Sequence, residues 1–275
     1  MFDPKTKKYP YTQYTNQHYL VVKKDRGIVF DSNYPYIDHS KWFRFKQALS
    51  RILLNVLAFP VATIRLGLII KGRKIIKENK ELLKKGAISC ANHVHMWDYI
   101  CLMKAIRPFH SYILVWDKNI NGENGTMMRL VGGIPIPEGN IRASVKFTQE
   151  VDELVQNGGW LHIYPEGSMW EYYAPIRPFK SGIGYCAVRN NKPILPMAFS
   201  YREPGWIRKH IFKQIACFTL SIGNPILPDM SLDKKDREHD LLVRSHDAVC
   251  QLAGIDPKEN IYPPVFDNTE RVDYY

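Results

Sequence analysis

The sequence predicts an α/β fold, a single domain with a largely parallel sheet flanked by helices. The first reason is that short apolar runs typical of buried strands alternate with helical patterns through the middle of the chain. The second is that polar motifs directly follow several of these runs, at the strand ends where α/β folds place their chemistry. The third is that 275 residues, 45% hydrophobic and 24% charged, suffice for one large domain with a proper core. No internal repeat or strong boundary divides the chain.

The expected elements follow one another from residue 66 onward. Strands are predicted at 66–70, 87–91, 111–116, 160–164, 193–199 and 215–222. Helices are predicted at 96–106, 125–131, 140–158, a short stretch ending at 189, and 234–252. Asn140 is the predicted N-cap of the third helix and Gly158 its predicted end. Residues 1–40 are expected to form an extended arm, with a membrane-interface role for their tyrosines as the alternative, and no signal-peptide core is present in the first 15 residues.

Residues 41–66 are predicted to form a membrane-interfacial helical segment. From Ile52 to Ile64 the chain is apolar except for Asn55 and Thr63, and Pro60 is expected to kink any helix there. This run of thirteen residues is too short to span a bilayer, for which about 20 are needed. Cationic and aromatic side chains flank it: Lys41, Trp42, Phe43, Arg44, Phe45, Lys46, Arg51 and Arg65. Such flanks favour a helix in the headgroup plane, with a core helix of a soluble domain as the alternative.

The formal net charge of +11 and the pI near 9.3 indicate an anionic partner. Nucleic acid, anionic lipid and an acidic carrier protein are the candidates, but no recognition motif supports nucleic acid. The basic stretch Lys71–Lys85 is either a solvated face or a lipid contact. The five cysteines form no C-x-x-C pair, so neither a disulfide framework nor a zinc site is expected, and a reducing compartment fits best.

The motif Ala91–Asp98 places a histidine and an aspartate five positions apart, directly after a predicted strand. In that position Asp98 can accept the proton on one ring nitrogen of His93, which leaves the other nitrogen free to take a proton from a substrate. No serine or cysteine is needed if the substrate's own hydroxyl is the nucleophile. In a chain with nine histidines, however, chance can supply one such spacing. His95 forms an H-x-H pair with His93, but a third metal ligand at a recognisable spacing is lacking, so no metal is expected.

Four blocks stand in one order along the chain: N-H-V-H-M-W-D at 92–98, G-G-I-P-I-P at 132–137, Y-P-E-G-S at 164–168 and P-I-L-P-M at 193–197. Together they resemble the glycerolipid acyltransferase family, typified by 1-acylglycerol-3-phosphate acyltransferase. The element F-K-S-G at 179–182 is also similar. The resemblance extends over roughly residues 66–225, and four blocks in order are far more specific than any one of them.

The resemblance implies that His93 is the general base and Asp98 its orienting partner. His93 would deprotonate the hydroxyl of a lysolipid, which would attack the thioester of acyl-CoA or of an acyl carrier protein. No further cofactor is implied. Since a thioester is already activated, a positioned base and good orientation supply most of the catalysis.

The resemblance also implies an acceptor site. Its predicted substrate-binding residues are Glu166, Gly167, Ser168, Arg177 and Lys180. For Glu166 the alternative is a carboxylate satisfied by nearby backbone N–H groups, and for Lys180 an ordinary surface lysine.

Two positions depart from the family pattern. Glu138 stands where the second block would end in arginine, and Met169 stands where the third block would carry one. The family's arginines are associated with the phosphate of the acceptor, for which a guanidinium is a natural bidentate partner. Lys180, Arg177 and Arg142 are candidates to substitute for them; otherwise a phosphomonoester is not expected to be the best acceptor.

These observations divide the chain into an arm at 1–40, a membrane-associating segment at 41–66, an acyltransferase domain at 67–255 and an extension at 256–275. The expected function is acyl transfer to 1-acylglycerol-3-phosphate or a related lysophospholipid in phospholipid biosynthesis. The expected partners are membrane lipid and the acyl donor, not nucleic acid. The expected location is the cytoplasmic face of a membrane, as a monotopic or peripheral protein. The alternative is a family member that binds lipid without acyl transfer.

Overall fold

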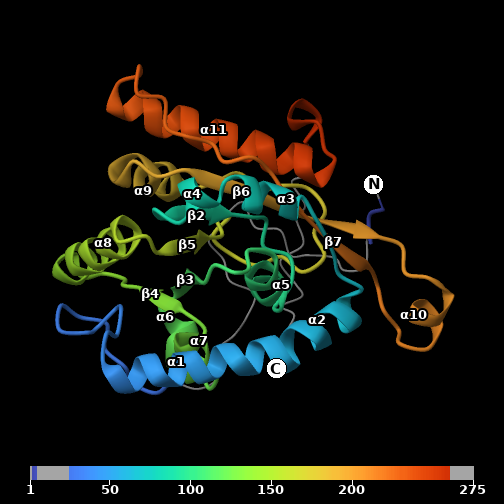
Figure 1. Ribbon diagram of the computed structural model, residues 1–275, viewed down its shortest axis with the longest axis horizontal. Coiled ribbons are helices and arrows are strands. Elements are labelled where there is room, and N and C mark those ends of the chain that lie inside the picture. Colours follow the sequence, from blue (N-terminus) through green and yellow to red (C-terminus); the bar gives the residue numbers. More distant parts are fainter. Residues whose placement is uncertain (1, 5–24, 261–275) are drawn as a thin grey trace.

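A computed structural model describes residues 2–4 and 25–260, so that most of the predicted arm and the end of the predicted C-terminal extension lie outside the described residues (Figure 1). Within the described part, seven strands form one sheet in the order β1-β7-β6-β2-β5-β3-β4. The strands are β1 (Ile69–Lys71), β2 (Ala87–Cys90), β3 (Ser111–Trp116), β4 (Gly133–Ile136), β5 (Trp160–Ile163), β6 (Ile194–Arg202) and β7 (Cys217–Ile222). Only β6 and β7 pair antiparallel among them. The predicted α/β fold with a largely parallel sheet is confirmed.

The register of the central strands determines where the motifs meet. Every residue of β2 and β5 is buried, as expected for parallel strands covered on both faces. These two strands are direct neighbours, and Cys90 at the end of β2 lies opposite Ile163 at the end of β5. The chain therefore leaves both strands at the same height, which brings the loop after β2 beside the loop after β5.

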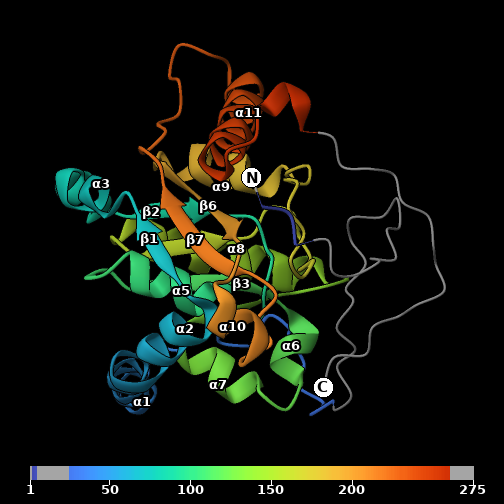
Figure 2. The same ribbon diagram turned by 90° about the vertical axis from the view of Figure 1, so that its right-hand side faces the viewer.

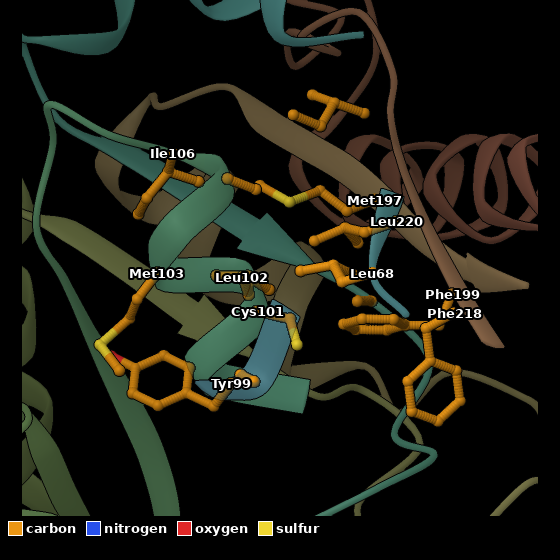
Figure 3. Close-up of a cluster of buried hydrophobic side chains, with 14 of the residues drawn as sticks. Leu68, Tyr99, Cys101, Leu102, Met103, Ile106, Met197, Phe199, Phe218 and Leu220 are labelled. Carbon is orange, nitrogen blue, oxygen red and sulfur yellow. The ribbon is translucent and has the colours of Figure 1, made fainter. Parts of the chain in front are cut away.

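Helices cover both faces of the sheet (Figure 1). They are α3 (Arg73–Glu78), α4 (Lys80–Leu83), α5 (Asp98–Ala105), α6 (Asp117–Asn121), α7 (Gly125–Leu130), α8 (Ile141–Gln156), α9 (Gly182–Asn190), α10 (Trp206–His210) and α11 (Lys234–Ala253). One core cluster joins α8, α9 and α11 to one face of the sheet, through residues such as Val155, Ala187 and Val249. The other joins α5 to the opposite face, where Leu102 packs in the same cluster as Met197 and other buried side chains (Figure 3).

The predicted element boundaries agree with the structure in most places. The Asn140 side chain accepts a hydrogen bond from the Ala143 N–H at 3.1 Å and caps α8, as predicted. The strand predicted at 66–70 is wrong in position, because a helix continues to Leu66 and β1 begins only at Ile69. Strand β4 was not predicted at all, since its prolines are unusual within a strand, although β4 is an edge strand where they are tolerated.

The segment at 41–66 is one continuous helix of 26 residues (Figures 1 and 2). It consists of α1 (Lys41–Leu53), a π-helical turn η1 (Leu54–Ala58) and α2 (Phe59–Leu66). Pro60 is the second residue after the wider turn. The wider turn accommodates a proline, which has no N–H and crowds the carbonyl four residues earlier. By length and composition this helix is apolar enough to cross a membrane, with a mean hydropathy of 1.5. The helical segment predicted at 41–66 is present as a helix over the same residues, and it extends well beyond the thirteen-residue apolar run.

One side of this helix packs against the domain and the other does not. Gln47, Phe59, Ala62 and Leu66 are buried on its inner side. Large apolar side chains are exposed along the outer side: Trp42, Phe45, Leu49, Ile52, Leu53, Val56, Leu57, Val61 and Ile64. The helix lies along the domain beside α5 and α7 (Figure 1).

Candidate active site

The loop after β2 is held in place by backbone and side-chain hydrogen bonds. The buried Asn92 amide donates to the carbonyl of Phe199 on β6 at 3.0 Å and accepts from its N–H at 2.8 Å. On the other side of the loop, the N–H of Trp170 donates to the carbonyl of His93 at 2.9 Å. The loop that carries the candidate base is therefore attached both to a central strand and to the segment that follows β5.

His93 and Asp98 form a hydrogen-bonded pair, as the motif predicts. The Nδ1 atom of His93 lies 2.7 Å from Oδ2 of Asp98, and the Asp98 side chain is 1% exposed. The same oxygen accepts the backbone N–H groups of Val94 and His95 at 3.0 and 3.3 Å. The other oxygen, Oδ1, accepts the hydroxyl of Tyr164 at 2.7 Å. Every face of this buried carboxylate is thus occupied by a donor.

These donors keep Asp98 ionised despite its burial. Desolvation by burial raises the pKa of Asp98, but the His93 ring, the Tyr164 hydroxyl and the Val94 N–H together hold it below its ordinary value. An ionised Asp98 accepts a proton from Nδ1 of His93 and fixes the ring in one tautomer. His93 is 25% exposed, and its Nε2 makes no hydrogen bond to any described residue. That nitrogen is free to accept a proton from a substrate.

Tyr164 contributes to the pair in a way that the sequence did not reveal. Its ring stacks on the His93 ring with centroids 3.9 Å apart and planes 8° from parallel. Burial, the nearby Asp98 and the hydrogen bond to it raise the pKa of Tyr164 well above its ordinary value, so it remains a hydrogen-bond donor. The sequence signal that could have revealed this role is the tyrosine at the first position of the third block. Its hydroxyl holds Asp98 while its ring supports His93.

A second, neutral histidine lies behind this pair. Burial lowers the pKa of His162, on β5, to about 3. Trp160 donates its indole N–H to the Ser89 hydroxyl at 2.8 Å, and the Ser89 oxygen lies 2.9 Å from Nδ1 of His162. The ring meets Tyr164 edge-on, with centroids 4.4 Å apart. His162 thus packs beneath the ring that supports His93.

His93 opens into a cavity of about 500 Å³. Its walls come from β3, β4, β5, α8, α9 and the loop after β5. The two positions at which the chain departs from the family pattern, Glu138 and Met169, both line it, as does Lys180. Apolar side chains form most of the remaining wall, among them Ile113, Val115, Phe147, Val151 and Ile183. An apolar cavity with a few polar groups next to a base is the form expected of an active site for a lipid-like substrate.

Glu166 and Arg177 form a buried ion pair and do not line the cavity. Their side chains are 2% and 1% exposed, and a guanidinium nitrogen lies 2.8 Å from Oε2 of Glu166. The carboxylate also accepts the backbone N–H groups of His93 at 2.9 Å and Arg177 at 2.8 Å. Arg177 further donates to the hydroxyl and carbonyl of Ser168 and lies over the ring of Trp170. The geometry favours the alternative considered for Glu166, a carboxylate satisfied by local donors, and it leaves Arg177 unable to replace a phosphate-binding arginine.

The remaining substrate-binding candidates separate into those near the cavity and those away from it. Gly167, Ser168 and Lys180 line it. Gly167 has φ of 84° and lies so close to the Lys180 ammonium that a Cβ at this position would overlap it. Desolvation by burial, with Arg177 nearby, lowers the pKa of Lys180. Arg142 is exposed on α8 and is not among the lining residues, so Lys180 is the one lysine or arginine of the described residues that lines the cavity.

His95 is placed away from the cavity. It is 7% exposed, and its Nδ1 accepts the Trp97 N–H at 3.1 Å. Its Nε2 lies 3.8 Å from a carboxylate oxygen of Glu171. Burial lowers the pKa of His95. The second histidine of the H-x-H pair thus helps to hold the loop, and within the described residues no three metal-binding side chains cluster together.

Comparisons with known proteins relate part of the chain to acyltransferases. Residues 72–200 match the model of the Acyltransferase family. Among solved structures, the fold is similar to that of the 1-acyl-sn-glycerophosphate (LPA) acyltransferase PlsC from Thermotoga maritima, at 16% sequence identity and a TM-score of 0.45 over 77% of this chain and 83% of that one. No curated protein sequence matched the chain. The matched residues, just under half of the chain, contain all four motifs of the resemblance, so this part of the chain is similar to acyltransferases.

Proposed function

We propose that the protein transfers a fatty acyl group from a thioester donor to the hydroxyl of a lysolipid at a membrane surface. One observation carries the proposal. Nε2 of His93 is unengaged within the described residues beside a largely apolar cavity of about 500 Å³, while Nδ1 is held by a buried, ionised Asp98. That arrangement activates a hydroxyl supplied by the substrate.

The proposed reaction proceeds by direct attack of the acceptor. Nε2 of His93 takes the proton from the lysolipid hydroxyl as its oxygen attacks the thioester carbonyl. The positive charge that develops on the ring is stabilised by Asp98. When the tetrahedral intermediate collapses, the C–S bond breaks and the departing sulfur takes the proton from His93. The products are an ester and a free thiol, and the dyad returns to its starting state.

The charges of the cavity constrain the acceptor. Lys180 provides one positive charge, and Glu138 provides a negative charge whose carboxylate accepts the indole N–H of Trp116 at 3.2 Å. A phosphomonoester carries close to two negative charges at neutral pH, and a carboxylate beside it would repel it. We therefore propose a lysophospholipid whose phosphate is esterified to a headgroup, in preference to 1-acylglycerol-3-phosphate.

The exposed apolar side of the 41–66 helix supports a monotopic attachment to the membrane. A second apolar patch lies next to it, formed by Trp206, Ile207, Ile211 and Phe212 on and after α10. The two are joined where the Arg208 guanidinium donates to the Ile64 carbonyl at 2.7 Å (Figure 2). Because the inner side of the helix packs on the domain, we propose that the helix lies in the headgroup plane and does not cross the bilayer. The cytoplasmic face is proposed on the absence of disulfides among the five cysteines of the described residues.

The replacement of His93 by alanine tests the reaction. His93→Ala is expected to reduce thioester-dependent acylation by about a thousandfold, the scale of a general base. The purified variant and a His39→Ala control, at an exposed position, would be compared by release of free thiol in the presence of lysolipid. Retained activity in His93→Ala would contradict the mechanism. Binding of lysolipid without any thiol release by the wild type would instead favour the lipid-binding alternative.

A panel of acceptors tests the substrate class. Lysolipids with and without a phosphomonoester would be assayed with both acyl-CoA and acyl carrier protein as donors. We expect esterified headgroups to be preferred. We also expect Lys180→Gln to raise KM for the preferred acceptor, whereas Lys235→Gln, on the exposed side of α11, leaves it unchanged. A clear preference for 1-acylglycerol-3-phosphate would contradict the acceptor proposal and leave the reaction class intact.

A further inference from the structure

A second cavity, of about 250 Å³, lies between the 41–66 helix and the domain. It is lined by α1, η1 and α2 on one side and by the α5–β3 and α7–β4 connections on the other. Ser111 and Gly132 are part of its wall, so the cavity is at the amino ends of β3 and β4. His93 follows the carboxyl end of β2, at the opposite edge of the parallel strands. The second cavity is therefore separate from the catalytic one.

The charged groups of this cavity are all cationic or titrate to a cation. Arg51, Arg107 and His110 line it, and no aspartate or glutamate of the described residues does. Within the described part of the chain, neither guanidinium forms an ion pair. The Arg107 guanidinium lies over the Phe59 ring, 6.0 Å from its centroid. Burial and the charges of Arg51 and Arg107 lower the pKa of His110, with no carboxylate opposing them. The two guanidinium groups thus share this cavity with no carboxylate among its described lining residues to neutralise them, and His110 is held towards its neutral form.

A buried amide faces the same cavity. Gln47 on α1 is 5% exposed and lines the cavity, yet its side chain has no hydrogen-bond partner among the described residues. Its amide atoms are not fully enclosed by protein, so they face the open space of the cavity. Two guanidinium groups without an ion-pair partner among the described residues, together with an amide that is free to donate, form a set of donors suited to an anion.

The surroundings indicate the kind of anion. The cavity opens beside the helix whose outer side exposes Leu53 and Val56, adjacent in sequence to the lining residues Leu54 and Asn55. A phospholipid at this surface places its acyl chains along the apolar side and its phosphate at the height of the cavity. Guanidinium groups bind phosphate oxygens through paired, charge-assisted hydrogen bonds.

We propose that this cavity binds the phosphate of an anionic phospholipid headgroup, as a lipid site distinct from the catalytic cavity. Arg51 and Arg107 bind the phosphate oxygens, and Gln47 donates its amide N–H. The site attaches the helix to the membrane in a fixed orientation. It does not depend on the identity of the acyl acceptor.

Sedimentation with vesicles tests the site. The double variant Arg51→Gln/Arg107→Gln would be compared with Lys41→Gln/Arg44→Gln, which removes two exposed charges from the same helix without touching the cavity. Vesicles of phosphatidylcholine alone and of equal parts phosphatidylcholine and phosphatidylglycerol would be used. The cavity variant is expected to lose about tenfold more affinity for the anionic vesicles than the control, which reports only the general attraction of cations to the surface. Equal losses in the two variants would overturn the proposal.

A second measurement separates a lipid headgroup from free phosphate. The His110 ring would be followed by NMR in detergent micelles, during additions of phosphatidylglycerol, its soluble glycerophosphodiester or inorganic phosphate. We expect saturable shifts with the lipid and weaker ones with the soluble diester, all absent in the cavity variant. Saturation by inorganic phosphate at the same concentration as the lipid would overturn the lipid assignment.

Activity distinguishes this site from the catalytic one. With substrates dispersed in detergent, the cavity variant is expected to keep the kcat of the wild type, while acylation on anionic vesicles falls with the loss of binding. Loss of activity in detergent, in a variant that remains folded by circular dichroism, would overturn the separation of the two sites. Failure of the acyl-transfer assay in the wild type would bear on the proposed function and leave the vesicle result unaffected.

Discussion

Two loops at the same edge of the sheet each contain a fully buried carboxylate, but the two carboxylates have different roles. Asp98 follows β2 and Glu166 follows β5, and each is 1% exposed. The hydrogen-bonded partner of Asp98 is His93, which opens into the cavity of about 500 Å³. The cationic partner of Glu166 is Arg177, which is itself buried and fully surrounded by protein.

The difference shows that the partner, and not the carboxylate, decides the role. A carboxylate bound to a histidine that lines a cavity fixes the tautomer of the ring and stabilises the positive charge that the ring gains during the reaction. A carboxylate bound to a buried arginine accepts hydrogen bonds from backbone N–H groups and stabilises the conformation of the loops. Glu166 accepts the N–H of His93, so the second pair holds in place the backbone of the first.

The largest expected effect on activity comes from Asp98→Asn. The amide would fit the same space but could not accept the Nδ1 proton in the same way, so His93 would adopt the wrong tautomer. We expect kcat to fall by about 10³- to 10⁴-fold, the scale known for such a change in a histidine–aspartate pair. The measurement is thiol release at saturating substrate. Asp236→Asn, on the exposed start of α11, is the control and should keep full activity.

Glu166→Gln is expected to act on stability instead. Loss of the negative charge leaves Arg177 buried without a counter-ion, which costs about 3 kcal/mol of unfolding free energy. Denaturant unfolding measures this loss, and kcat and KM of the folded protein should change by less than about threefold if the pair has no contact with substrate. A raised KM for the acceptor with unchanged stability would mean that Glu166 binds the acceptor directly.

The buried His162 gives the protein a pH dependence that an exposed histidine would not. Its folded pKa of about 3 lies below the ordinary value of 6.5, so between these two pH values the unfolded chain binds a proton that the folded protein excludes. The contribution of His162 to the free energy of unfolding is therefore fully present above pH 6.5. It is lost as the pH falls, and the free energy of unfolding then decreases by up to about 1.4 kcal/mol per pH unit. The free energy of unfolding of His162→Gln, measured between pH 4 and 6, should therefore depend less steeply on pH than that of the wild type. An unchanged slope would show that His162 is protonated in the folded state.

The smallest expected effect is that of Tyr164→Phe. The ring would still stack on His93, but Asp98 would lose one donor and become more basic. The dyad would then hold its proton more strongly, and the acidic limb of the kcat/KM profile would move to higher pH, with less than about a tenfold loss at the optimum. A pH–rate profile for both proteins measures this. A uniform loss at every pH would assign Tyr164 a purely structural role.

The prediction from sequence succeeded where local pattern carries the information. The strands at 111–116 and 160–164, the cap at Asn140 and the alternation of elements were all readable, because apolar periodicity and capping chemistry act over a few residues. It also placed a helix at 41–66, but it did not predict the π-helical turn before Pro60, because sequence periodicity does not register such a turn.

The sequence by itself determined the reaction class, because the spacing of His93 and Asp98 and the order of four motifs are written along the chain. The tertiary structure alone decided which of the surrounding charged groups remain available to a ligand. It buried Arg177 in an ion pair with Glu166 and placed Lys180 at the cavity beside His93. It left Arg51 at another cavity, without an ion-pair partner among the described residues. The physical reason is that a charge is neutralised by whatever the fold brings within a few ångströms of it, and that distance depends on contacts between residues far apart in sequence.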